Sequence, residues 1–195
     1  ILPGPPREMK AMFNDYIVDY LKGLTKDVLK SKVLRLFGIG ESVMAKKVEH
    51  LMNNNSNPTI APYAKESDTI LRITAKASSE KECIELIKPI EEEIKSILGE
   101  YIYGEDEDSL ESVVSKLMIN KKLNIGVAES CTGGMIASTL ISYPGISEVF
   151  NEGAVTYSNE AKIRRLGVKE ETLEKFGAIS FEVAKEMCEG IAKTS

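Results

Sequence analysis

The 195-residue sequence has no tryptophan, a single histidine and three cysteines. It also lacks any run approaching the ~20 consecutive apolar residues that a membrane-spanning helix needs, and no secretory signal is visible at its start. The cysteines, Cys83, Cys131 and Cys188, are widely spaced and odd in number. That pattern fits a reducing compartment better than a disulfide-stabilised secreted domain. We therefore expect a cytoplasmic protein with no membrane association.

The shortage of histidine limits the chemistry further. With His50 alone, a Ser-His-Asp or Cys-His site has at most one candidate base, and a histidine-rich metal site is excluded within this chain. Positive charge is not in excess either, since the net charge is −5 and the sequence pI is about 5.2. This balance argues against a protein built mainly to bind nucleic acid.

The charge is unevenly distributed along the chain. Acidic and basic residues balance over residues 1–100, so the entire net charge lies in residues 101–195. The change begins at residues 104–108 (GEDED), which we interpret as an acidic linker between two domains. The same acids would also suit a solvated helix N-terminus, where they interact favourably with the helix dipole.

Hydrophobic periodicity predicts two folded parts around this run. Residues 1–22 combine a proline-containing start with one amphipathic helix, which is too little for a domain. Residues 23–103 predict strands at 27–37, 59–64 and 69–75 and helices at 43–51 and 79–98, the latter with Ile84, Ile87, Ile90, Ile94 and Leu98 facing inward. The order β-α-β-β-α indicates a small α+β domain.

Residues 109–195 predict alternating strands and helices. Strands are expected at 123–128 and 152–157, and helices at 109–120, 135–142, 159–166, 170–176 and 181–193. The first helix should bury Leu110, Val113, Val114, Leu117 and Met118, with Asp108 or Ser109 as N-cap and Glu111 completing a capping box. The alternation favours an α/β domain with a partly parallel sheet.

The clearest chemical motif is residues 128–134 (AESCTGG), between a predicted strand and a helix. Ser130, Cys131 and Thr132 are potential nucleophiles or hydroxyl donors, and Gly133 and Gly134 allow close approach of a ligand. The following helix N-terminus offers N–H groups to an anion or oxyanion. The same residues also fit an ordinary small-residue turn with a Ser or Thr cap.

A serine nucleophile here would need a base other than histidine. A lysine whose pKa is lowered by burial or by a second cation can serve. If the two predicted strands are parallel neighbours, Lys162 and Tyr157 lie at the same sheet edge as Ser130, where open α/β sheets place ligands. Lys162 could equally be a solvated helix lysine, and Tyr157 a half-buried sheet residue.

Gly38 and Gly40 form a second glycine pair, in residues 37–42 (FGIGES). An isolated GxG is a weak phosphate-loop signal, and its spacing does not match the GXXG clamp of nucleic-acid-binding KH domains. Glu41 would place an anion where an RNA phosphate would lie. These residues therefore argue against nucleic-acid binding.

Three stretches together resemble the CinA family (competence/damage-inducible protein A). Residues 2–6 (LPGPP) with Glu8 and Met9 resemble the end of its molybdopterin-binding-like N-terminal domain, and residues 37–42 its KH-like middle domain. Residues 128–134 with 153–159 (GAVTYSN) and Lys162 resemble its C-terminal nicotinamide mononucleotide deamidase domain. The resemblance implies a tail at 1–22, a KH-like domain at 23–103, a linker at 104–108 and the first half of a three-layer α/β deamidase domain at 109–195.

The resemblance also implies a function. Ser130 would be the nucleophile and Lys162 its general base, with Tyr157 assisting or orienting. Thr132, Gly133, Gly134 and Asn159 would bind the substrate, nicotinamide mononucleotide, which would be hydrolysed to nicotinic acid mononucleotide and ammonia in pyridine-nucleotide salvage. No cofactor or metal is implied for this reaction, although the family's N-terminal pyrophosphatase domain is associated with a divalent metal.

The resemblance further implies a homodimer acting on a small nucleotide. Because the sequence begins with Ile1 and stops in an expected helix before a glycine-rich segment of the family's pocket, we expect it to be truncated at both ends. The alternative from another functional class is a non-catalytic spacer or dimerisation module, built on the KH-like domain and linking two enzyme domains.

Overall fold

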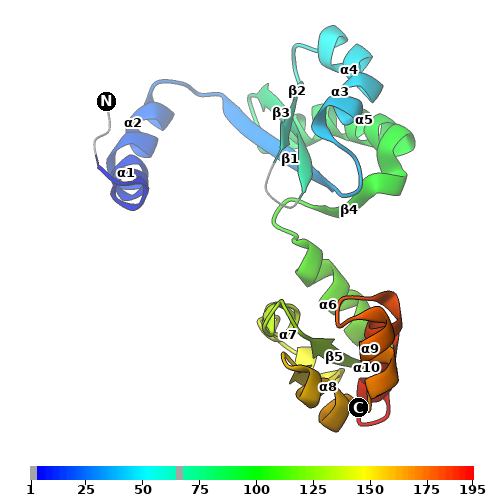
Figure 1. Ribbon diagram of the computed structural model, residues 1–195. Helices are drawn as coiled ribbons and strands as arrows, with labels where there is room; N and C mark the ends of the chain where they lie inside the picture. The colour runs from blue at the N-terminus through cyan, green and yellow to red at the C-terminus, as the bar shows by residue number, and fades with distance from the viewer. Residues whose placement is uncertain (1–3, 65–67) are drawn as a thin grey trace. The chain divides into compact units, whose positions relative to one another are not determined.

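The computed structural model describes residues 4–64 and 68–195. Its chain divides into two compact units, residues 1–107 and 108–195 (Figure 1). The first unit contains an antiparallel sheet and the second a parallel pair of strands. The predicted fold class, an α+β domain followed by an α/β domain, is therefore confirmed.

The described chain opens with a helical segment, as its hydrophobic spacing predicts. The segment consists of α1 (Pro6–Met12), a π-helical turn (Phe13–Ile17) and α2 (Val18–Gly23). Pro6 begins the first turn, where a missing N–H costs no hydrogen bond. No side chain of residues 6–17 is buried. The prediction of a non-helical start falls partly on residues 1–3, which lie outside the described residues.

The first unit is built on a four-stranded antiparallel sheet with the order β2-β3-β1-β4. The paired strands β1 and β3 run in register over their full length, from the pair of Val28 and Ala77 to that of Leu36 and Thr69. Helix α5 packs against both strands. The elements of the sheet and its helices are β1 (Val28–Leu36), α3 (Glu41–Lys47), α4 (Glu49–Asn54), β2 (Thr59–Ala64), β3 (Thr69–Ala77), α5 (Glu80–Leu98), a 3-10 turn (Gly99–Tyr101) and β4 (Ile102–Glu105).

The core of this unit lies between the sheet and the helices α3, α4 and α5. Ile87, Ile94 and Leu98 are buried as the helical spacing predicts, and the helix continues through Pro89. The prediction is wrong for Ile84, which is half exposed, whereas Cys83 is fully buried. The Cys83 thiol donates to the carbonyl of Val28, 3.3 Å away, so the buried stripe of the helix runs through Cys83.

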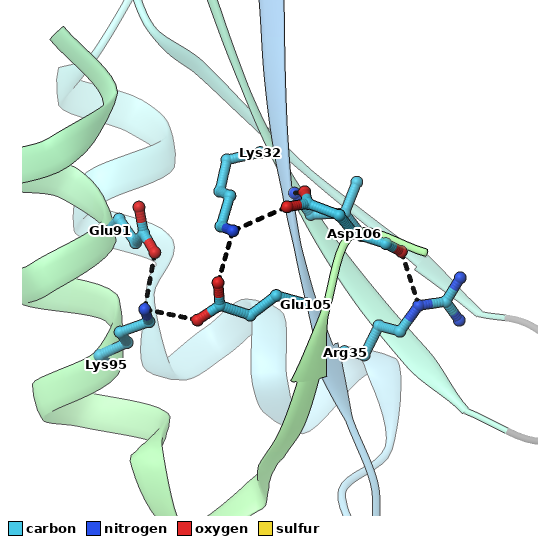
Figure 2. Close-up of polar contacts among 7 residues, drawn as sticks. Lys32, Arg35, Glu91, Lys95, Glu105 and Asp106 are labelled. Atoms are coloured by element: carbon cyan, nitrogen blue, oxygen red, sulfur yellow. Dashed lines mark hydrogen bonds and ion pairs between the residues drawn. The ribbon is translucent and has the colours of Figure 1, made fainter. Parts of the chain in front are cut away.

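Residues 104–107 of the acidic run belong to the first unit, whereas Asp108 begins the second unit and pairs with Lys116 over 3.0 Å. Gly104 and Glu105 end β4, and Asp106 exchanges hydrogen bonds with the backbone of Val33, its amide donating to the Val33 carbonyl over 2.8 Å. Two lysines neutralise the negative charge of this run. Lys32 forms ion pairs with Glu105 and Asp106, and Lys95 forms one with Glu105. Figure 2 shows these contacts, in which Lys32 and Lys95 pair with carboxylates and Arg35 donates to the backbone carbonyl of Asp106; the residues drawn and labelled are Lys32, Arg35, Glu91, Lys95, Glu105 and Asp106.

The second unit alternates helices with two parallel strands. Glu129 pairs with Val155 at the carboxyl ends of these strands, as expected for neighbouring parallel strands. The elements are α6 (Leu110–Lys121), β5 (Ile125–Glu129), α7 (Met135–Ile141), a 3-10 turn (Ile146–Glu148), β6 (Phe150–Val155), α8 (Asn159–Leu166), α9 (Glu170–Phe176) and α10 (Phe181–Ala192).

Helices cover both faces of this strand pair. A Cβ added at Gly126 would meet Ile191 of α10, and one added at Gly153 would meet Ala137 of α7. Gly153 lies opposite Val127 in the register, and neighbouring strand residues point to opposite faces. Helices α10 and α7 therefore lie on opposite faces, which gives three layers.

Helix α6 differs most from its prediction. Leu110, Val114 and Leu117 are exposed, and the buried residue is Ser115, whose hydroxyl has no hydrogen-bond partner among the described residues. The capping box is present, but Ser109 pairs with Ser112 and not with Glu111. Within residues 4–64 and 68–195, no helix is long and apolar enough to cross a membrane.

Candidate active site

Ser130 lies on the turn that connects β5 to α7. The Gly133 amide donates to the Ser130 carbonyl over 3.0 Å, which closes a tight turn with Cys131 and Thr132 at its centre. Gly133 and Gly134 have φ values of +63° and +98°, a backbone region that side-chain-bearing residues rarely adopt. A Cβ at Gly134 would also lie 3.3 Å from Val155. The two glycines therefore shape the turn itself.

Lys162 is buried beside this turn, with 2% of its surface exposed. It extends from α8, which begins just beyond the end of β6 with Ser158 as its N-cap. The Nζ atom lies 2.9 Å from the Thr156 carbonyl, 3.1 Å from the Tyr157 carbonyl and 3.1 Å from Ser130 Oγ. The parallel strands thus bring together a serine and a lysine that are 32 residues apart in sequence.

These three contacts define what the Lys162 amine can do. A neutral amine has two N–H donors and one lone pair in a tetrahedral arrangement. The three oxygen contacts match the three N–H donors of an ammonium group, and in a neutral amine two donors on the carbonyls leave the lone pair for Ser130 Oγ. In that state the nitrogen can accept the serine proton, as required of a general base that activates a hydroxyl nucleophile.

A second buried charge, Glu129, lies immediately before Ser130. Its side chain is 3% exposed and reaches the start of α7. One carboxylate oxygen accepts from the amides of Gly134 and Ile136, each at 3.1 Å, and the other accepts from the Ala137 amide at 2.8 Å. The carboxylate therefore satisfies helix N–H groups that would otherwise have no intrahelical partner.

The hydrogen bonds determine the ionisation of Glu129. Burial by itself raises the pKa of its carboxyl group. The bonds from Ala137, Thr132, Ile136 and Gly134 outweigh burial and leave that pKa below its ordinary value. Glu129 is thus an internal anion at the helix N-terminus, stabilised in its charged form.

This carboxylate changes the interpretation of the expected substrate-binding residues. The amides of Gly133 and Gly134 already donate within the turn and to Glu129, and the Thr132 hydroxyl also bonds to Glu129. The amides of Cys131 and Thr132 make no hydrogen bond within the described part of the chain. An anion held through the free backbone amides of this turn would therefore meet residues 131 and 132, while the expected roles of Thr132, Gly133 and Gly134 in substrate binding stay predictions.

Tyr157 and Asn159 lie on the segment that leads into Lys162. Tyr157 contacts the lysine through its backbone carbonyl, while 75% of its surface is exposed. Asn159 is the first residue of α8, one turn before Lys162, and its side chain is exposed. The structure joins Ser130, Lys162 and the Tyr157 backbone directly, but it does not bring the Asn159 side chain into that cluster.

Two residues of the site were not predicted from the sequence. Glu129 precedes the turn instead of occupying a usual N-cap position, so no capping pattern identifies it. Thr156 is 1% exposed, its carbonyl binds Lys162, and its amide donates to the Glu129 carbonyl over 2.8 Å. Its place directly after a strand is the only signal that the sequence offers.

Potential metal ligands do not cluster among the described side chains. Across the described ranges, no group of three or more His, Cys, Asp or Glu side chains could hold a metal ion.

Comparison with known proteins identifies both units. The model of the CinA C-terminal domain matches residues 107–195, and that of the damage-inducible protein CinA KH domain matches residues 31–104. A competence-damage inducible protein of Clostridium perfringens is 62% identical over all 195 residues, which cover 47% of its own length. One from Clostridium kluyveri is 58% identical, with 48% of its length covered.

A solved structure, the competence/damage inducible protein CihA from Agrobacterium tumefaciens, is 42% identical over 44% of this chain and 52% of that chain, with a TM-score of 0.43. The chain spans about half the length of the curated relatives that it matches. From the two domain matches and the clostridial relatives, we conclude that the chain belongs to the CinA family.

Proposed function

We propose that the chain carries the Ser-Lys dyad of an amidohydrolase that converts nicotinamide mononucleotide to nicotinic acid mononucleotide and ammonia. The observation that supports this most strongly is the 3.1 Å contact between Lys162 Nζ and Ser130 Oγ, made by a lysine that is 2% exposed. A buried lysine is rare unless it is paired or functional. The nucleotide substrate is proposed from the resemblance of residues 128–134 and 153–159 to the family's deamidase motifs.

The reaction follows from this pairing. Ser130 Oγ attacks the carboxamide carbon while its proton passes to Lys162 Nζ. The tetrahedral intermediate then collapses, the C–N bond breaks, and the departing nitrogen takes the proton from Lys162 and leaves as ammonia. Water, deprotonated by Lys162, attacks the acyl ester, which releases the carboxylate product and returns the proton to Ser130.

The proposal also includes the compartment, the oligomeric state and the cofactor requirement of the enzyme. The described cysteines, Cys83, Cys131 and Cys188, are free, which is compatible with a reducing cytoplasm. Following the family resemblance, we propose that the whole protein works as a homodimer on a small nucleotide. The reaction itself needs no cofactor.

Ammonia release from nicotinamide mononucleotide by the full-length parent protein tests this proposal. We expect activity that Ser130→Ala reduces by at least about a thousandfold, because this substitution removes the nucleophile. Cys131→Ala is the matched control, since it changes the neighbouring thiol and should keep most of the rate. A Ser130→Ala rate close to that of the wild type, with Cys131→Ala inactive, would transfer the nucleophile to Cys131.

A second function is favoured by the first unit. Its core is separate, with fully buried residues such as Leu34, Leu71 and Ile94. The Asp68 side chain, 6% exposed, is paired with Arg35 over 2.9 Å. This unit fits a spacer or dimerisation module. Size-exclusion chromatography with an ammonia assay on these 195 residues distinguishes the two functions: a defined but inert oligomer supports the spacer, and measurable turnover supports the enzyme.

A further inference from the structure

We infer that Glu129 is a positioning residue for the nucleophile: its carboxylate anchors α7 to the end of β5, so that the intervening turn presents Ser130 to Lys162. This inference rests on the proposed function, because it assigns a role within the same site. Glu129 does not contact Ser130 Oγ or Lys162 Nζ, and it acts through the backbone.

The main-chain contacts of Glu129 fix it on two sides. Its carbonyl accepts from the Thr156 amide over 2.8 Å, which ties it to the end of β6. Its carboxylate accepts from three amides of residues 134–137 at 2.8–3.1 Å, which ties it to α7. Ser130 is the next residue in the chain, between the attachment of Glu129 to β6 and the start of α7. The position of its Oγ therefore depends on both.

Glu129 also determines which amides remain available in the turn. Its carboxylate takes the N–H groups at the start of α7, whereas those of Cys131 and Thr132 stay without a partner in the described chain. Donors adjacent to a nucleophile can stabilise the oxyanion that develops in acyl transfer. Glu129 thus leaves the amides of residues 131 and 132 as the donors of the turn that have no partner in the described chain.

An ordinary capping role predicts a different behaviour from a positioning role. A cap contributes to stability alone, so its removal should lower the melting temperature without changing the reactivity of correctly folded Ser130. Glu186 provides a matched comparison in the same unit. Its carboxylate accepts from the Lys169 amide at 2.8 Å and from the Thr172 hydroxyl at 2.9 Å, and so anchors the start of α9.

The experiment measures how fast a fluorophosphonate labels Ser130 in the full-length parent protein. This serine-directed probe reports nucleophile activation and does not depend on the identity of the amide substrate. Glu129→Gln keeps the shape of the side chain but presents an N–H₂ group to backbone N–H donors. Glu186→Gln makes the same chemical change at α9, and Ser130→Ala confirms the labelled position by peptide mapping.

We expect Glu129→Gln to slow labelling about ten- to a hundredfold, as small displacements of reacting groups do. The kcat for ammonia release should fall in parallel, while KM changes less than about threefold. Glu186→Gln should label at the wild-type rate. Glu129→Asp retains the charge on a shorter side chain and should recover part of the rate, which also covers the case in which Glu129→Gln folds poorly.

Labelling of Glu129→Gln within twofold of the wild type would overturn the inference. Equal slowing in Glu129→Gln and Glu186→Gln would overturn it as well, because the effect would then reflect stability alone. Failure of the proposed substrate gives a separate result: no ammonia is released by the wild type, yet Ser130 is labelled and Glu129→Gln still slows the labelling. If the wild-type protein is not labelled at Ser130, both the proposed Ser-Lys dyad and the positioning role of Glu129 are contradicted.

Discussion

The two units of this chain use charged residues in opposite ways. In the first unit, Lys32, Lys95 and Glu105 form ion pairs across β1, β4 and α5, and all three side chains keep at least a fifth of their surface exposed (Figure 2). In the second unit, Glu129 and Lys162 are buried as whole residues and make no ion pair within the described parts of the chain, whereas the most enclosed pair of the first unit, Arg35 with Asp68, joins two opposite charges. Glu129 and Lys162 both lie within one residue of Ser130 or in contact with it.

This difference separates stabilising charges from charges that build a site. Exposed ion pairs contribute about 0–1 kcal/mol each and are weakened by salt. A buried charge is costly unless hydrogen bonds compensate for it, and here each buried charge has at least three polar partners. Two buried, hydrogen-bonded charges in one small region are typical of a functional site.

Replacing the buried lysine should give the largest effect. We expect Lys162→Met to lower ammonia release by the full-length protein about a hundred- to ten-thousandfold, the range of general acid-base catalysis. Folding should be largely kept, since an apolar side chain of similar length suits a buried position. Circular dichroism and thermal unfolding provide the folding control, and a well-folded Lys162→Met protein with wild-type kcat would contradict the assignment of the base.

Acid should affect both units, but salt should distinguish them. Hydrogen bonds from Lys32 and Lys95 lower the pKa of Glu105, and the backbone amides of α7 with Thr132 lower that of Glu129 against the effect of burial. A depressed pKa in the folded state gives stability that is present above the unfolded pKa and is lost as pH falls through the folded value. Both units should therefore weaken as the pH falls below about 4.

Hydrogen exchange of individual peptides measures this acid response in each unit. Adding about 1 M salt should increase exchange in β4, whose ion pairs it screens, and leave α7 nearly unchanged because the Glu129 contacts are buried. Equal salt sensitivity of hydrogen exchange in β4 and α7 would contradict the proposed difference between the exposed ion pairs and the buried Glu129 contacts.

Removing the exposed ion pairs of Lys32 in the first unit should have a smaller effect than replacing Lys162. Lys32→Met removes the contacts to Glu105 and Asp106 and should destabilise the first unit by about 1 kcal/mol. Chemical denaturation at low and high salt measures this loss, which should shrink at high salt, while kcat stays unchanged. A large loss of kcat would show that the first unit contributes to the site.

Tyr157→Phe should have the smallest effect. The tyrosine contacts Lys162 through its carbonyl, which the substitution keeps, and its phenol lies on an exposed side chain. We expect kcat and KM within about twofold of the wild type. A loss of a hundredfold in steady-state kinetics would instead assign a catalytic role to the phenol.

Local patterns predicted most elements, because strands such as residues 59–64 and helices such as residues 159–166 have clear periodicity and caps. The expected parallel strands placed Ser130 and Lys162 at one sheet edge, but only the family resemblance paired them. The exposed face of α6 could not be predicted, because periodicity shows that a helix is amphipathic but not what covers it. The role of Glu129 could not be predicted, because its hydrogen-bond partners are backbone amides and these are not encoded by any pattern of side chains.

Trapping the acyl-enzyme of the full-length parent protein tests the central claim most directly. After rapid acid quenching of a reaction with nicotinamide mononucleotide, intact-mass measurement and peptide mapping locate the adduct. The Ser-Lys dyad predicts one acyl group per chain on Ser130, absent in Ser130→Ala and strongly reduced in Lys162→Met. An adduct on Cys131, or ammonia release from Ser130→Ala at the wild-type rate, would contradict it.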